Sequence, residues 1–132
     1  MTSDEKGTGD EVRPKNFKDL LVWQRGMALA KAIYQLTQEF PREEKFGLVS
    51  QMRRAAVSIP SNIAEGQARH STGEFVQSIS HAEGSLAELE TQLRLSLELS
   101  FCRDNEVHET LALMEELRKM LNALRRRLVT RH

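Results

Sequence analysis

One polar stripe has residue types and a spacing that could form a binding site. Arg54, Ser58, Asn62, Glu65 and Arg69 follow one another at steps of four, four, three and four residues. They therefore share one face of a helix if that helix continues past a nearby proline. In a ligand or partner site, the guanidinium groups would supply charge and the Asn and Glu side chains directional hydrogen bonds. The alternative, which we favour, is a polar network between helices or subunits that satisfies backbone groups freed by the proline.

Basic side chains also gather near the C-terminus. Six cations and no acid follow Glu116: Arg118, Lys119, Arg125, Arg126, Arg127 and Arg131. A nucleic-acid surface would combine part of this cluster with arginines of the second predicted helix and just after it: Arg53, Arg54, Arg69, Arg125, Arg126 and Arg127. Cations at a helix C-terminus also complement the helix dipole, and consecutive arginines point in different directions around a helix. We favour this second interpretation because no interleaved aromatic residues offer base stacking.

Catalytic and metal-binding patterns are missing from the sequence. No Glu-x-x-His pair occurs, and the four histidines, His70, His81, His108 and His132, each lack a second ligand at a useful spacing. Cys102 has no assigned His partner and is expected to be a structural thiol. We therefore expect no catalytic residue, no metal and no cofactor, and a protein that is not an enzyme.

Composition indicates what kind of protein carries these residues. The chain has 132 residues, 39% of them hydrophobic, and its nineteen basic residues balance nineteen acidic ones. That profile is typical of one globular domain with no overall attraction to nucleic acid. A single cysteine and no apolar run of signal or membrane length predict a cytoplasmic protein that does not enter a membrane. We expect a flexible polar tail over residues 1–16 and one domain over residues 17–132.

The first half of the domain is expected to contain two helices. The first, over residues 17–39, has two apolar stripes: Leu20, Trp23, Met27, Ala30 and Tyr34, and Val22, Leu29, Ile33, Leu36 and Phe40. The second spans residues 42–66, with its core face at Leu48, Met52, Ala55, Ile59 and Ile63. Pro60 should kink or break it, and Gly66 should terminate it in a left-handed conformation.

Two longer helices follow. Ser71 and Glu74 have the spacing of a capping box, so the third helix should begin there and reach about residue 100. Its seam is Phe75, Ile79, Ala82, Leu86, Leu89, Leu93 and Leu97. Asp104 or Asn105 can cap the fourth helix. Four amphipathic helices with short connections predict an all-α fold, an antiparallel up-down-up-down four-helix bundle.

Surplus apolar surface predicts that the protein is not a monomer. We expect an interface between subunits at one stripe of the first helix and at two outward leucines of the third: Val22, Leu29, Ile33, Leu36, Leu95 and Leu99. The third helix also carries five glutamates against Arg94 alone, and this acidic face could attract the basic tail of a neighbouring subunit.

A long motif resembles a known family. Residues 53–66, RRAAVSIPSNIAEG, preceded by Phe46-Gly47-Leu48 and by Leu20-Leu21-Val22-Trp23, resemble the bacterial four-helix-bundle proteins named after intervening sequences in 23S ribosomal RNA genes. The resemblance covers about residues 17–128. It implies a homopentamer with no catalytic activity. Relatives similar in fold are accessory proteins of diversity-generating retroelements, which bind nucleic acid and a reverse transcriptase.

Two functions are therefore expected. The first is a non-enzymatic homo-oligomer, pentameric by the resemblance, that acts in assembly or as a scaffold. The alternative is an accessory protein that binds nucleic acid through basic residues of the second and fourth helices. The expected partners are other copies of the chain, and nucleic acid or another protein.

Overall fold

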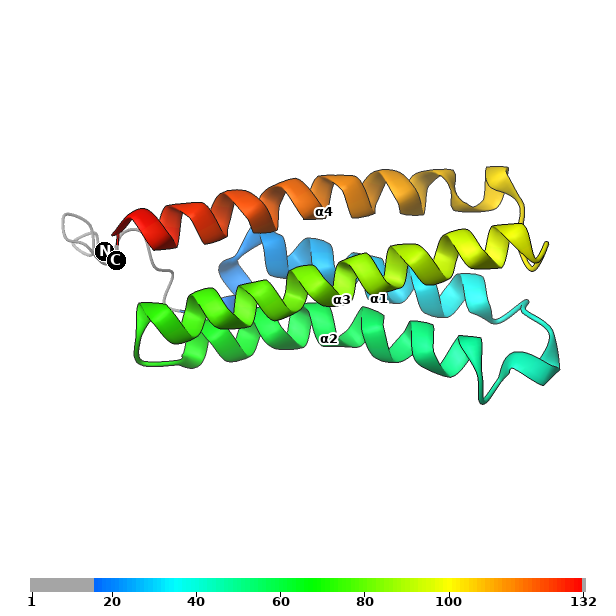
Figure 1. Ribbon diagram of the computed structural model, residues 1–132, viewed down its shortest axis with the longest axis horizontal. Coiled ribbons are helices and arrows are strands. Elements are labelled where there is room, and N and C mark those ends of the chain that lie inside the picture. The colour runs from blue at the N-terminus through cyan, green and yellow to red at the C-terminus, as the bar shows by residue number, and fades with distance from the viewer. Residues whose placement is uncertain (1–15, 132) are drawn as a thin grey trace.

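The computed structural model describes residues 16–131, which form four long α-helices and two short 3₁₀ turns. The helices are α1 (Leu21–Thr37), α2 (Leu48–Ala68), α3 (Thr72–Glu98) and α4 (Asp104–Arg131), and the turns are η2 (Phe17–Asp19) and η3 (Arg42–Glu44). Figure 1 shows the α2–α3 turn and the C-terminal end of α4 at one end of the bundle, and the α1–α2 and α3–α4 connections at the other.

The predicted fold class is confirmed. Consecutive helices run in opposite directions and pack side by side, so the chain is an all-α, antiparallel up-down-up-down four-helix bundle. None of the helices in residues 16–131 combines the length and hydrophobicity that a membrane crossing needs. Of the expected polar tail, residues 1–15 lie outside the described part of the chain.

The first two helices are shorter at their starts than predicted. Asn16 accepts a hydrogen bond from the Lys18 amide and caps η2, and Leu20 is extended, so α1 begins only at Leu21. The segment after Pro41 forms the separate turn η3. The α2 helix begins after Gly47, where the Glu44 carboxylate accepts from the Leu48 amide at 3.2 Å.

The α2 helix runs unbroken through Pro60, so the predicted local break does not occur. Gly26 of α1 faces this point: a Cβ atom on Gly26 would lie 3.5 Å from ring atoms of Pro60. The predicted terminator at Gly66 is also wrong, because the helix continues to Ala68. Gly66 instead lets α3 approach closely, since a Cβ there would lie 2.7 Å from Cβ of Ser78.

The ends of α3 follow recognisable capping patterns. The hydroxyl of Ser71 accepts from the Glu74 amide at 3.1 Å, which confirms the predicted N-cap. At the other end Ser100 has a positive φ of 64°. The amides of Ser100 and Phe101 donate to the carbonyls of Leu97 and Ser96 at 3.0 and 2.9 Å. This is a Schellman motif with serine where glycine is usual.

The start of α4 differs from the prediction. Neither Asp104 nor Asn105 precedes the helix, because α4 already begins at Asp104. Instead the Glu106 carboxylate reaches back and accepts from the Arg103 amide at 2.8 Å, while the Glu106 amide donates to the Arg103 carbonyl. An acidic side chain in the first turn of α4 therefore satisfies the amide just before the helix.

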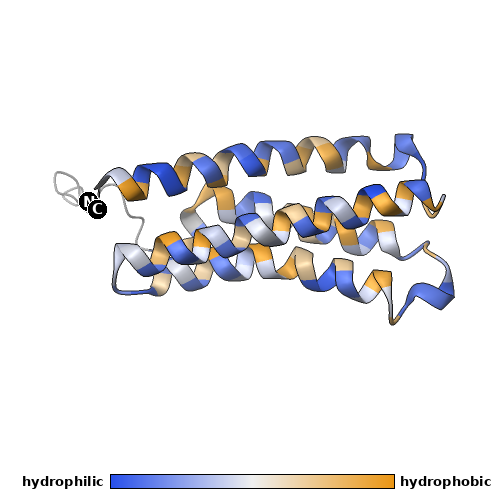
Figure 2. Ribbon diagram, in the orientation of Figure 1, coloured by the Kyte–Doolittle hydropathy of each residue, from blue (hydrophilic) through white to orange (hydrophobic). Residues whose placement is uncertain are grey.

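A continuous apolar seam holds the four helices together. All helices contribute fully buried side chains, the largest of which are Phe75, Leu29, Ile33, Met52, Ile59, Ile63, Ile79, Leu89, Leu93, Met114, Leu117 and Leu121. The predicted seam of α3 is buried from Phe75 to Leu93, and Leu97 is half-buried against the core. Hydrophobic and hydrophilic residues alternate along every helix in Figure 2, as amphipathic helices require.

Two ion pairs join α4 to its neighbours. Nε of Arg25 in α1 lies 3.0 Å from Oε2 of Glu116. Nε of Arg125 lies 2.8 Å from Oε1 of Glu83 in α3. The second pair is the less exposed of the two, so solvent screens it less.

Candidate functional site

The predicted polar stripe lies on one side of α2, because the helix continues past Pro60. Its members differ in environment: Ser58 and Asn62 are half-buried, whereas Arg54, Glu65 and Arg69 are exposed. The stripe is also divided between two hollows. Its first two residues border a groove between α1 and α2, and its last three border a polar cleft between α2 and α3.

Hydrogen bonds inside the stripe are mostly local. Ser58 donates to the Ala55 carbonyl at 3.0 Å and lies 2.5 Å from the Ser85 hydroxyl of α3. Asn62 donates to the Ser58 carbonyl at 2.8 Å. These donors do not reach the Ala56 carbonyl, whose helical donor Pro60 lacks. The Ser58–Ser85 contact does link two helices, as an inter-helix network would.

The polar cleft combines the end of α2 with the start of α3. It has a volume of about 290 Å³ and is lined by Asn62, Glu65, Arg69, Glu74, Gln77, Ser78 and His81. Arg69 and Glu65 form an ion pair at 3.3 Å, and both side chains are about half exposed. A solvated pair of this kind contributes little to stability.

The α1–α2 groove is larger and more apolar, with a volume of about 710 Å³. It is lined by Tyr34 of α1, by Lys45 and Phe46 of the connection, and by Val49, Ser50, Arg53, Arg54, Val57, Ser58 and Ser61 of α2. The Phe46 side chain is 88% exposed and Val57 is 43% exposed. Large apolar side chains gathered at one exposed place are typical of an interaction surface.

Arg53 and Arg54 have different roles in this groove. Arg53 is half-buried: its Nε donates to the Thr37 hydroxyl at 2.9 Å, and its guanidinium carbon lies 4.5 Å from the centroid of the Tyr34 ring. Arg54 is exposed and forms no ion pair with any described residue. Arg53 therefore shapes the groove, and Arg54 presents a free charge beside it.

Helical periodicity did not single out Phe46 or Val57, although both lie in the segments that carry the family resemblance. Phe46 lies in a short connection where no helical period applies, and Val57 lies off the apolar repeat of α2. The periodic signal for this groove was the first stripe of α1, which contains Tyr34 and Met27, both of them substantially exposed.

The predicted subunit interface needs correction on α1. Val22, Leu29 and Ile33 are 5%, 0% and 0% exposed and belong to the core of the single chain. They cannot form a contact between subunits unless the bundle opens. Leu36 is half-buried and packs against the same core. The stripe assigned to the interface is therefore the one that holds the bundle together.

The two outward leucines of α3 are placed as predicted. Leu95 is 46% exposed and Leu99 is 50% exposed. They share a face of α3 with Gly84, Glu88, Thr91 and Glu98, at helical steps of three and four residues. We call these six residues, the two leucines included, the α3 face.

The six candidate nucleic-acid arginines do not form one surface. Arg54 and Arg69 are fifteen residues apart on α2, about 22 Å at 1.5 Å per residue. Arg125 forms an ion pair with Glu83, while Arg126 and Arg127 are exposed near the C-terminal end of α4. The groove arginines and the C-terminal arginines therefore lie toward opposite ends of the bundle (Figure 1).

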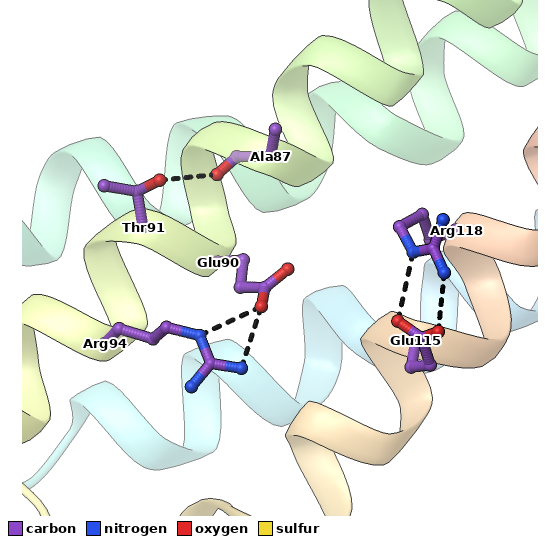
Figure 3. Close-up of polar contacts among 6 residues, drawn as sticks. All are labelled: Ala87, Glu90, Thr91, Arg94, Glu115 and Arg118. Carbon is purple, nitrogen blue, oxygen red and sulfur yellow. Dashed lines mark hydrogen bonds and ion pairs between the residues drawn. The ribbon is translucent and has the colours of Figure 1, made fainter.

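Among the other titratable or nucleophilic side chains, Cys102 is buried and Glu115 is held in an ion pair. Burial raises the pKa of the Cys102 thiol, and the nearby Glu106 and Asp104 charges act in the same direction. A hydrogen bond from Arg118 lowers the pKa of Glu115, and the same bond raises the pKa of Arg118 (Figure 3). Within residues 16–131, no group of three or more His, Cys, Asp and Glu side chains is arranged to hold a metal ion.

Comparison with known proteins identifies a family. No curated protein matches the chain. Residues 18–123 match the family described as 23S rRNA-intervening sequence protein, a region that begins in η2 and ends in the C-terminal half of α4. It includes both the α1–α2 groove and the α3 face. The chain therefore belongs to the 23S rRNA-intervening sequence protein family.

Proposed function

We propose that the protein is a non-enzymatic homo-oligomer, with five subunits as the family resemblance implies, that acts in assembly or as a scaffold in the cytoplasm. The observation that carries the proposal is the exposure of large apolar side chains in clusters, at Leu95 and Leu99 and around Phe46. Clustered apolar surface of this kind is costly to leave in water and is normally covered by a partner.

Two further features support this role. The Cys102 thiol is free and buried, as is usual in a reducing compartment. Its raised pKa disfavours the thiolate, which is the nucleophilic form of cysteine. Assembly explains the exposed apolar residues, whereas catalysis would leave them without a role.

Replacing Leu95 and Leu99 with lysine tests the proposal. The double variant L95K/L99K should shift the protein from an oligomer to smaller species in sedimentation velocity, because two charges would be buried at the contact. Val129→Lys is the matched control, since Val129 is equally exposed, at 51%, but lies near the end of α4. The proposal fails if the unmodified protein sediments as a monomer. Unchanged circular dichroism would show that both variants fold.

A second function, nucleic-acid binding, has one observation in its favour. Arg126 and Arg127 are exposed, and neither forms an ion pair with a described residue. If they contact phosphates, the affinity for labelled nucleic acid should fall with salt by a logarithmic slope of about 0.9 per contact for duplex DNA and about 0.7 for a single strand. The variant R126Q/R127Q should then reduce that slope, and R42Q in η3 should not. Absence of binding at low salt would remove this candidate.

A further inference from the structure

Two surfaces at the same end of the bundle carry opposite charge. The α1–α2 groove is lined by Lys45, Arg53 and Arg54, with no acidic residue among its lining side chains. Lys45 lies 5.4 Å from the ring centroid of Phe46, so a cation and the most exposed aromatic ring stand side by side. The groove is therefore both basic and apolar.

The α3 face is acidic and apolar. Glu88 and Glu98 flank its two leucines, and neither forms an ion pair with a described residue. The nearest cation on the same helix, Arg94, is held by Glu90 at 2.9 Å, as Figure 3 shows. The charges of Arg94 and Glu90 cancel, so Glu88 and Glu98 make the α3 face negative.

The two surfaces also differ in side-chain size. Phe46 and Val57 are exposed at the groove, whereas Gly84 and Thr91 of the α3 face are small. A Cβ atom on Gly84 would meet nothing within 4 Å, so this point is open. The Thr91 hydroxyl already donates to the Ala87 carbonyl at 2.9 Å (Figure 3), so covering it would leave no unsatisfied donor.

We infer that the α1–α2 groove of one copy receives the α3 face of a second copy of this chain. This inference rests on the proposed function and names the two surfaces that meet. Arg54 and Lys45 lie opposite Glu88 and Glu98, and Leu95 and Leu99 cover the exposed apolar side chains of the groove. Matching charge around an apolar centre fixes the orientation of such a contact.

The contact is head-to-tail, because the two surfaces are different. In a pair, one copy still has a free groove and the other still has a free α3 face. Further copies therefore bind until the two free surfaces meet and the ring closes. Both surfaces lie toward the end that carries the α1–α2 and α3–α4 connections (Figure 1). Neighbouring copies then stand at the same level along the bundle axis, as they do in a closed ring.

Two variants, each with one surface blocked, test this geometry. R54E/V57E blocks the groove and leaves the α3 face intact, whereas L95K/L99K blocks the α3 face and leaves the groove intact. All four positions are exposed, so both variants should keep native helicity and a cooperative thermal transition. The mass of each variant, and of an equimolar mixture, is measured by light scattering on a sizing column.

Each blocked variant alone should be a monomer near 15.1 kDa. The mixture should form a one-to-one complex of twice that mass, about 30 kDa, through the single intact groove and the single intact α3 face. Arg54→Lys, which keeps the charge, should leave the oligomer unchanged.

Three results would overturn the inference in different ways. If either blocked variant alone remains an oligomer, or if the mixture forms no complex, the two surfaces do not meet each other, although self-assembly still stands. If the unmodified protein is itself a monomer, the proposed function fails and this inference fails with it.

Discussion

The guanidinium carbon of Arg53 lies 4.5 Å from the centroid of the Tyr34 ring and so ties α2 to α1 along the wall of the groove. The same side chain donates from Nε to the Thr37 hydroxyl and from Nη2 to the Tyr34 carbonyl. Its planar, forked shape allows all three contacts at once, which a lysine cannot reproduce.

Arg53→Lys should therefore lower the free energy of unfolding by about 1 kcal/mol. Arg54→Lys is the matched control one residue away, and because Arg54 is exposed, its effect should stay within about 0.5 kcal/mol. Urea denaturation followed by circular dichroism measures both, at one fixed protein concentration because assembly is linked to stability. Equal effects of the two changes would show that the Arg53 contacts contribute nothing.

Gly66→Ala should destabilise the bundle even though alanine is the better helix former by about 1 kcal/mol. The added Cβ would lie 2.7 Å from Cβ of Ser78 and 2.8 Å from Cδ1 of the buried Phe75. Relieving this overlap should cost about 1–3 kcal/mol. Gly73→Ala, where a Cβ meets nothing within 4 Å, should be neutral or slightly stabilising in the same thermal melts. A G66A protein as stable as the native one would contradict the close approach of α2 and α3.

Ser100→Gly should stabilise the fold by about 1 kcal/mol, because glycine tolerates the φ of 64° that serine adopts at the end of α3. The backbone hydrogen bonds of the Schellman motif would be unaffected. Ser80→Gly, in the middle of α3, should have the opposite sign because glycine weakens a helix interior. Chemical denaturation of both variants gives the comparison, and a loss of stability in S100G would argue against strain at this turn.

The native Cys102 thiol should resist iodoacetamide, since its residue is only 6% exposed and its pKa is raised. Intact mass spectrometry should find little alkylation of the native protein and complete alkylation in denaturant. Rapid labelling without denaturant would place the thiol in an accessible site.

The raised pKa of Cys102 also predicts how stability changes with pH. The folded state favours the neutral thiol, so its contribution is fully present below the ordinary pKa of an unfolded-state thiol and is lost as the pH rises through and beyond that pKa. Cys102→Ala should lack this alkaline loss. Denaturation curves of the two proteins from pH 7 to about 10 would reveal it, and parallel curves would refute it.

Most of the fold could be predicted because the spacing of apolar residues and the capping of helix ends depend only on residues close together in the sequence. The α3 seam from Phe75 to Leu93 and the Ser71 cap follow from spacing alone. Gly66 shows the limit of such reasoning. A glycine near an expected helix end also suits a close helix crossing, and only the packing of α3 distinguishes the two.

The candidate site could be predicted only in part. The two stripes of α1 repeat at the same helical spacing, so the period alone could not tell that Val22 and Leu29 face the core while Met27 and Tyr34 face outward. Phe46 gave no periodic signal because it stands in a connection. Its exposure depends on how α1 and α2 meet, which is a property of the whole bundle.

The native mass of the unmodified 132-residue chain, measured by light scattering on a sizing column at low salt, tests self-assembly most directly. Assembly of five copies through the α1–α2 groove and the α3 face predicts five times 15.1 kDa, about 75 kDa. A mass near 15.1 kDa at every concentration tested would contradict it, and the exposed leucines of α3 would then need a different partner.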